Sequence, residues 1–334
     1  MRIAKTIFSV ALIGSMLFVT CGNASAMSDV RLNVREELEG NWDNEFVGEN
    51  PDVKFYPDAY ANYWRFALNR TDEYQNVGIK VTGSYPDARY MSFNVYNDKN
   101  LSPIASITDV DITPDAGSVN PFVTESNADN SYTIYVVPEG TNNVSGDNVV
   151  YFDDSLNRIS VFLRYYLPEQ NTKGGVTLPT IEAFDLTTGE TVELPKKYSK
   201  FVDSPSDMRL TVGNYLMKGI INPLFLLNRN GELSAYHSSG NGMFPNKDND
   251  YLVMPINKQD DEVAVVRFKA PELSTKTNEG DVRYYSVGQG DDQSHNLLTL
   301  SDEDLKVASD GYVYVVISEE EVDVNTELEY NYMP

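Results

Sequence analysis

The sequence is poor in the residues that most often carry metal or nucleophilic chemistry. It holds one cysteine, Cys21, and two histidines, His237 and His295. A zinc site needs three or four His, Cys or carboxylate ligands at defined spacing, and no HExxH pattern is present. Two serines follow His237, but adjacent side chains rarely reach a common point and there is no G-x-S-x-G elbow. A hydrolase that uses His237 and Ser239 is therefore the least favoured function, and we predict no catalytic residue from the sequence.

Basic residues are also scarce, with 26 Lys and Arg against 50 Asp and Glu, which gives a formal net charge of −24. Such a surface repels phosphate backbones and anionic lipid headgroups. The sequence also has no phosphate-binding loop and no dinucleotide fingerprint. We therefore expect no nucleic-acid partner and no nucleotide cofactor, although negative charge alone also serves to keep an exported protein in solution.

The one long apolar run lies near the N-terminus. Arg2 and Lys5 precede apolar residues 7–19, and the small residues Ala24-Ser25-Ala26 follow. This order predicts a secretory signal peptide cleaved after Ala26, because the run is short for a membrane span and ends in a cleavage box. We expect a secreted or periplasmic protein with no transmembrane segment in the mature chain.

Cys21 falls inside the segment that cleavage would remove. The mature chain would then have neither a disulfide nor a thiol nucleophile, and packing alone would stabilise it. An alternative makes Cys21 the lipid-bearing first residue of a lipoprotein, but Phe18-Val19-Thr20 fits that signal poorly. Loss of Arg2 and Lys5 leaves 24 basic against 50 acidic residues, a formal net charge of −26.

After the first 50 residues the sequence turns to short alternating runs separated by Gly, Pro, Asn and Asp, which is typical of antiparallel sheet. The run 159–167 is apolar on both faces and ends at Pro168, so we predict a buried central strand there. Ser204-Pro205-Ser206-Asp207 resembles a helix start, and apolar residues recur at helical spacing until Pro223.

A short phrase occurs twice: Asp87-Ala88-Arg89-Tyr90-Met91-Ser92-Phe93 and Asp281-Val282-Arg283-Tyr284-Tyr285-Ser286-Val287. Successive side chains alternate across a strand, so Met91 and Phe93 should face a core while Tyr90 and Ser92 face water or a groove. The Asp and Arg of each phrase lie two residues apart, and we expect them to pair with each other.

The order of strand-like runs around the phrase is also repeated, which favours an internal duplication. We predict a mainly β protein of two antiparallel β-sandwich domains, jelly-roll-like, with one connecting helix. The predicted organisation is a signal peptide at 1–26, an N-terminal arm at 27–50, a first sandwich at 51–203, the helix at 204–223 and a second sandwich at 224–334.

Two stretches support a resemblance. The strand and loop of residues 88–122, with the sequence Pro-Asp-Ala-Gly-Ser-Val-Asn-Pro-Phe near its end, and the Phe-Pro-Asn-Lys-Asp stretch at 244–252 resemble a family of exported bacterial proteins of unknown function. The resemblance implies a bacterial, exported protein built of β-sandwich or jelly-roll-like domains. It implies no activity and no site residue.

Candidate ligand-binding residues come from the non-core face of the repeated phrase, where flat rings and hydroxyls suit sugars or peptides. A tyrosine on a strand is often only half-buried packing, and that interpretation is open for each of them. The candidates are Tyr90, Ser92, Tyr96, Tyr284, Ser286 and His237. Calcium takes oxygen ligands from irregular loops, so the metal candidates are Asp109, Asp111 and Asp115, without EF-hand spacing.

The absence of catalytic signatures favours a non-catalytic binding protein for a small molecule, a glycan or an extracellular partner. A structural or self-assembling surface protein is the alternative, because the apolar run 313–317 could pair with a neighbouring chain through an exposed sheet edge.

Overall fold

The protein is mainly β, as the sequence predicts. The computed structural model describes residues 7–14, 38–53, 56–70, 74–125, 128–194, 235–238, 244–256, 262–274, 280–291, 295–322 and 329–334. Its helical elements within these ranges are the 3-10 turns η1 (Glu39–Asn41) and η3 (Asp109–Asp111). The helix expected at 204–223 and residues 27–37 of the expected arm lie outside the described residues. No helix in the described ranges has the length and apolar character needed to cross a membrane.

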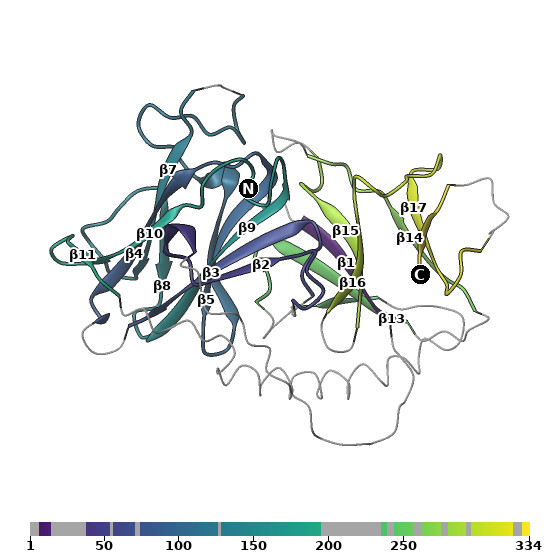
Figure 1. Cartoon of the computed structure of the whole chain (residues 1–334), viewed down its shortest axis with the longest axis horizontal. Coiled ribbons are helices and arrows are strands. Elements are labelled where there is room, and N and C mark those ends of the chain that lie inside the picture. Colours follow the sequence, from purple (N-terminus) through teal and green to yellow (C-terminus); the bar gives the residue numbers. More distant parts are fainter. Residues whose placement is uncertain are drawn as a thin grey trace, which may run out of the picture.

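The first half of the chain forms two five-stranded sheets (Figure 1). One has the order β2-β3-β9-β5-β6, and its strands are β2 (Asn44–Val47), β3 (Ala61–Asn69), β9 (Arg158–Pro168), β5 (Ala88–Asn97) and β6 (Ser102–Thr108). The other has the order β11-β10-β4-β7-β8, with β11 (Thr191–Val192), β10 (Thr180–Asp185), β4 (Val77–Ser84), β7 (Ser131–Pro138) and β8 (Val149–Phe152).

One hydrophobic core joins these two sheets into a sandwich. It takes Trp64, Phe93 and Leu163 from one sheet and Ile79 and Ile134 from the other, all without solvent exposure. The predicted central strand is confirmed, since β9 pairs antiparallel with β3 on one side and β5 on the other. Both faces of β9 are buried, one in this core through Ile159, Val161, Leu163 and Tyr165, and the other, which carries Ser160, Phe162 and Arg164, outside it.

The second half of the chain repeats this two-layer plan. Its five-stranded sheet has the order β12-β13-β1-β15-β16, with β12 (Tyr236–Ser238), β13 (Asn249–Ile256), β1 (Ile7–Gly14), β15 (Tyr285–Gly290) and β16 (Asn296–Ser301). The facing sheet has the order β14-β17-β18, with β14 (Ala264–Lys269), β17 (Tyr312–Ile317) and β18 (Asn331–Met333). A second core that includes Met254, Val287, Val313 and Met333 lies between them.

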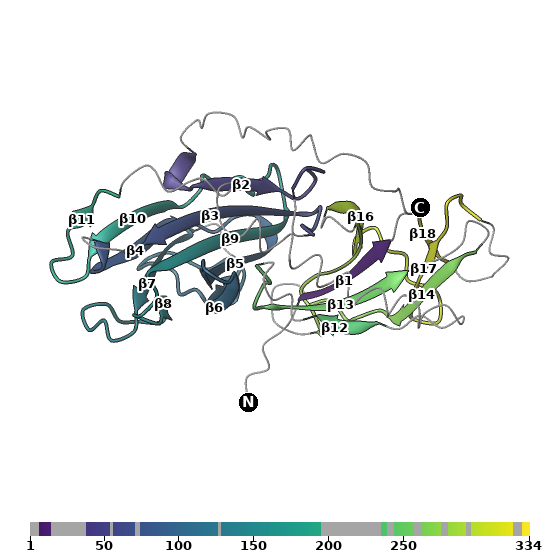
Figure 2. The same cartoon turned by 90° about the horizontal axis from the view of Figure 1, so that it is seen from below.

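The strand β1 comes from the other end of the sequence. It belongs to the segment expected to act as a signal peptide, yet it lies in the middle of the second half's larger sheet (Figure 2). It runs parallel to both neighbours, β13 and β15.

The apolar run 313–317 does not form an exposed sheet edge. It belongs to β17, which pairs antiparallel with β14 and parallel with β18. Val313 and Val315 are fully buried in the second core. The expectation that this strand offers an exposed edge for self-assembly is therefore wrong, because the strand is already paired on both sides.

The repeated phrase is built into β5 in the first half and leads into β15 in the second. The predicted alternation is correct, since Met91 and Phe93 enter the first core while Tyr90 lies in a separate aromatic cluster with Tyr166 and Tyr284. The expectation that the second face is wet is wrong. Tyr90 and Ser92 are buried as deeply as the core residues, because the two halves of the chain pack against each other there.

Candidate functional site

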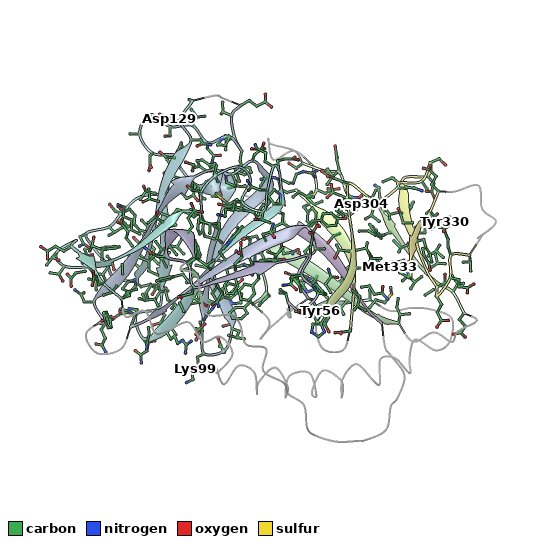
Figure 3. All side chains as sticks on the ribbon, viewed as in Figure 1. Tyr56, Lys99, Asp129, Asp304, Tyr330 and Met333 are labelled. Carbon is green, nitrogen blue, oxygen red and sulfur yellow. The ribbon has the colours of Figure 1, made fainter. Side chains whose placement is uncertain are left out.

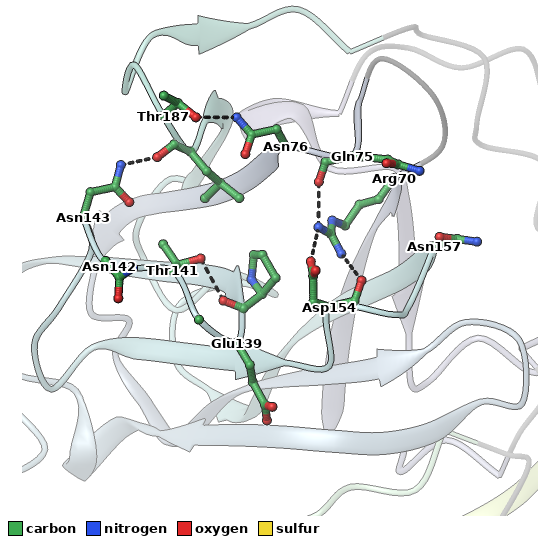
Figure 4. A pocket seen from close by; sticks show the side chains of 13 residues that line it. Arg70, Gln75, Asn76, Glu139, Thr141, Asn142, Asn143, Asp154, Asn157 and Thr187 are labelled. Atoms are coloured by element: carbon green, nitrogen blue, oxygen red, sulfur yellow. Dashed lines mark hydrogen bonds and ion pairs between the residues drawn. The ribbon is translucent and has the colours of Figure 1, made fainter.

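A polar pocket opens at one end of the first sandwich (Figure 4). Its volume is about 700 Å³. Four connections line it: the turn between β3 and β4, the loop between β7 and β8, the turn between β8 and β9, and the segment after β10. Its lining is dominated by amides, hydroxyls and backbone, with Gln75, Asn76, Thr141, Asn142, Asn143, Asn157 and Thr187 among its residues.

The only cation of this lining is Arg70, and its charge is already satisfied. Its guanidinium forms an ion pair with Asp154 at 2.8 Å and donates to the carbonyl oxygens of Gln75, Asp154 and Leu156. It also lies 5.0 Å from the centre of the Phe152 ring. Arg70 therefore holds the pocket's wall together rather than offering a free charge to a ligand.

The opposite wall is held by amide contacts. Asn76 donates to Asp185 and to Thr187, and Asn143 donates to the Leu186 carbonyl. Within the described part of the chain, the structure shows no hydrogen bond from the exposed side chains of Asn142 and Asn157. These two amides, from different loops, supply donors and acceptors for a neutral polar ligand.

The residues of the repeated phrase meet elsewhere, in a buried junction between the two halves. The Tyr284 hydroxyl donates to the Asp58 carboxylate at 2.8 Å and the Ser286 hydroxyl at 2.7 Å, although Asp58 belongs to the first half. Removal from water raises the pKa of the Asp58 carboxyl, and the hydrogen bonds from Ser286, the Tyr60 N–H and Tyr284 offset part of that rise. In the same way burial raises the pKa of Tyr284 well above its ordinary value.

Tyr90 makes the reciprocal contact from the first half into the second. Its hydroxyl donates to the Asp248 carboxylate at 2.9 Å, and Asn94 donates to the same carboxylate at 3.3 Å. Ser92, the counterpart of Ser286, instead accepts from Asn94 at 3.0 Å. In each half, therefore, a tyrosine hydroxyl donates a hydrogen bond to a carboxylate of the other half.

The arginines of the phrase also cross the junction. Arg283 pairs with Asp109 at 2.9 Å, and both side chains are at least 96% buried, since 4% and 0% of their surfaces are exposed. Arg89 pairs with Asp302 at 2.9 Å and with Glu303. The expected pairing of Asp with Arg inside each phrase is wrong, because the strand directs each arginine across the junction to the other half.

Side chains from the first half also reach into the second half at its edge. Tyr56 precedes β3, yet its hydroxyl donates to the Asp291 carbonyl at 2.8 Å. Tyr60 donates to Asp304 at 2.5 Å. Figure 3 shows Tyr56 beside the larger sheet of the second half, and Asp304 within that half. Burial and the adjacent Asp304 raise the pKa of Tyr60 to about 12.

Tyr96 and Arg164 form a second aromatic group in the junction. Tyr96 donates to the Pro245 carbonyl at 2.8 Å, and the Arg164 guanidinium donates to the Phe244 carbonyl at 2.9 Å. Arg164 lies 5.3–5.7 Å from the ring centres of Tyr63, Tyr96 and Phe162. These contacts account for the burial of Tyr96 without any ligand.

The predicted metal residues are not brought together. Asp109 accepts hydrogen bonds from the Met91 and Val110 N–H groups in addition to Arg283, whereas Asp111 contacts Thr108 and Asp115 contacts Thr133. In the ranges that the structure describes, no group of three His, Cys, Asp or Glu residues is placed to hold a metal ion.

His237 lies in β12, and in the described part of the chain the structure shows no hydrogen bond between it and the other predicted ligand-binding residues. Its Nε2 is 2.9 Å from an Asp250 oxygen, and both side chains are largely exposed. Ser239 lies outside the described residues. None of the predicted ligand-binding residues lines the polar pocket. Sequence reasoning missed the pocket because its lining comes from four connections spread over residues 70–187.

Comparison with known proteins gives information about the fold of this chain. No protein-family model and no curated protein sequence matches the chain. The solved structure of an uncharacterized protein from Burkholderia cenocepacia is similar, with a TM-score of 0.53 and 13% identity, over 89% of this chain and 75% of that one. The VPA0106 protein from Vibrio parahaemolyticus aligns with a TM-score of 0.41 and 12% identity, over 84% of this chain and 82% of that one. At such identity the first likeness shows a shared fold and nothing about activity.

Proposed function

We propose that this protein is an exported, non-catalytic binding protein that takes a neutral, hydroxyl-rich ligand, of saccharide chemistry, in the polar pocket of its first sandwich. The observation that carries this proposal is the lining of the 700 Å³ pocket, which is rich in amide and hydroxyl groups. Neutral saccharides present many hydroxyls that each donate and accept, and Asn and Thr side chains match this pattern.

Electrostatics narrow the ligand class further. An anionic ligand would meet a chain with a formal net charge of −24, and the one guanidinium of the pocket is already bound to Asp154. For a cationic ligand, the Asp154 carboxylate is already paired with Arg70, and Glu139 is the other carboxylate of the lining. A neutral ligand avoids the repulsion that an anion would meet, and it matches the amides and hydroxyls that make up most of the lining.

The N-terminal sequence supports export, through the basic, apolar and small-residue order of residues 2–26. The shared two-layer plan of the halves and the repeated phrase support an origin by internal duplication. Export places the pocket where extracellular or periplasmic glycans occur.

The test is calorimetric titration with a panel of neutral oligosaccharides, using the wild-type chain and the variants Asn142→Ala and Asn157→Ala. We expect each variant to weaken binding about two- to tenfold, because each removes hydrogen bonds of ordinary strength. Asn100→Ala, on the β5–β6 turn of the same sandwich, is the matched control and should bind as the wild type does. If no glycan of the panel binds, or if the control loses as much affinity as the pocket variants, the proposal fails.

A further inference from the structure

The second half of the chain fills the centre of its larger sheet in an unusual way. In the first half the strand order β3-β9-β5 places β9 between two antiparallel neighbours. In the second half the order β13-β1-β15 places β1 in the same position, but parallel to both neighbours. The central strands of the two halves therefore differ in direction and in origin.

The second sheet of each sandwich shows where the difference between β9 and β1 arises. In the first half β4 pairs antiparallel with β7, and β7 pairs parallel with β8. In the second half β14 pairs antiparallel with β17, and β17 pairs parallel with β18. The two series correspond strand by strand. β9 follows β8 along the chain, whereas the described residues of the second half contain no antiparallel strand in the position of β9.

The position between β13 and β15 requires a strand. Without one, β13 and β15 would each present a row of unpaired N–H and C=O groups, which is costly unless another strand covers them. The second core lies directly beneath, where Met254 and Ile256 from β13 and Val287 from β15 pack against Val313. An open position would expose these side chains to water.

The residues that fill the position are those expected to leave the protein. β1 comprises Ile7–Gly14, inside the apolar segment of the expected signal peptide, so this inference rests on the export part of the proposed function. We propose that the slot between β13 and β15 is a strand-acceptor site, occupied by β1 before processing and by an extended apolar segment of a partner polypeptide afterwards.

The chemistry of the partner segment follows from β9. Ile159, Val161, Leu163 and Tyr165 of β9 point into the first core and have no exposed surface. A strand with apolar residues at alternate positions, entering antiparallel to β13 and β15, would reproduce that arrangement above the second core. Antiparallel pairing is slightly more stable per residue than the parallel pairing of β1, so such a segment competes well for the slot. Backbone hydrogen bonds then supply affinity and the alternate side chains supply specificity.

The experiment uses the folded full chain with a protease site inserted after Ala26, so that β1 is released in vitro and export in cells is not needed. The probe is a synthetic peptide with the sequence of residues 158–167, offered before and after cleavage. Hydrogen exchange at β13 and β15 is the readout. We expect exchange there to rise on cleavage, and peptide at ten times its Kd to slow it about tenfold, by mass action. The uncleaved chain should not respond to the peptide.

The control peptide carries Pro at the positions of Val161 and Leu163, which removes backbone donors and disrupts the strand, and it should have no effect. A second variant, Val10→Pro in the uncleaved chain, should open the slot to the peptide without proteolysis. Unchanged exchange at β13 and β15 after cleavage, or a cleaved chain that dimerises in light scattering and ignores the peptide, overturns the proposal. Neither outcome affects glycan binding by the first sandwich, so the two proposals fail independently.

Discussion

At the scale of single residues, the buried carboxylate of Asp58 should make the stability of the protein depend on pH. Asp58 accepts hydrogen bonds from Tyr284 and Ser286, and the described contacts of its carboxylate include no cation. Desolvation therefore raises its pKa above 3.8, and the nearby Asp302 raises it further. Nothing in the Tyr-Pro-Asp sequence around Asp58 signals this environment, because the hydroxyl groups that contact its carboxylate belong to Tyr284 and Ser286, more than 220 residues away.

Asp58→Asn tests this assignment. A carboxyl with a raised pKa binds its proton more tightly in the folded than in the unfolded chain, so its contribution to stability falls as the pH rises from 3.8 through the raised pKa. We expect the free energy of unfolding of the wild type, relative to Asp58→Asn, to decrease across that window in urea titrations. Above the window the difference should stay constant.

Asp185→Asn is the control with the opposite sign. Backbone N–H groups of Thr188 and Thr187 lower the pKa of the Asp185 carboxyl, which is only partly buried. Its stabilising contribution is present above 3.8 and is lost as the pH falls through the lowered pKa. Equal slopes for the two variants would contradict the buried, cation-free environment of Asp58.

At the scale of elements, the sequence predicts strands well and their surroundings poorly. The apolar run of β9 and the alternation of β5 are visible from residue types alone, because a strand has a period of two and a buried strand has none. What covers the second face of β5 is not visible. Tyr90 and Asn94 reach Asp248 about 155 residues away, and polar residues on a strand usually indicate water.

Phe93→Ala measures how much β5 contributes through its core face. Phe93 is fully buried in the first core and contacts Tyr132 edge to face, with ring centres 6.0 Å apart. We expect the substitution to lower the free energy of unfolding by about 3–5 kcal/mol, the usual cost of losing a buried aromatic ring and leaving a cavity. Val265 on β14 is 49% exposed, so Val265→Ala should change the free energy of unfolding by less than about 0.5 kcal/mol. Similar losses in chemical denaturation would show that Phe93 does not lie in a close-packed core.

At the scale of the whole molecule, the repeated phrase connects the two halves. The repeat is visible in the sequence, as are two sandwiches, but the crossing of Arg89 to Asp302 and of Arg283 to Asp109 is not. A local Asp–Arg pair two residues apart is the simplest prediction, and the packing of the halves overrides it. The polar pocket was equally hidden, since loops that are neighbours only in the folded sandwich assemble it.

The buried Arg283–Asp109 pair should therefore couple the folding of the two halves. Removing one partner of a buried pair leaves the other charge uncompensated, so Arg283→Met should cost about 3–5 kcal/mol. Asp109→Asn keeps an acceptor for the Met91 N–H, and the double variant should recover part of that cost because no buried charge is left. The exposed Lys80–Glu182 pair, at 3.4 Å within one sheet, is the control and should show a coupling of about 0–1 kcal/mol. Differential scanning calorimetry distinguishes the outcomes. We expect a single unfolding transition in the wild type and two separated unfolding transitions in Arg283→Met. A single unfolding transition in both proteins would mean that the other contacts of the junction hold the halves together without this pair.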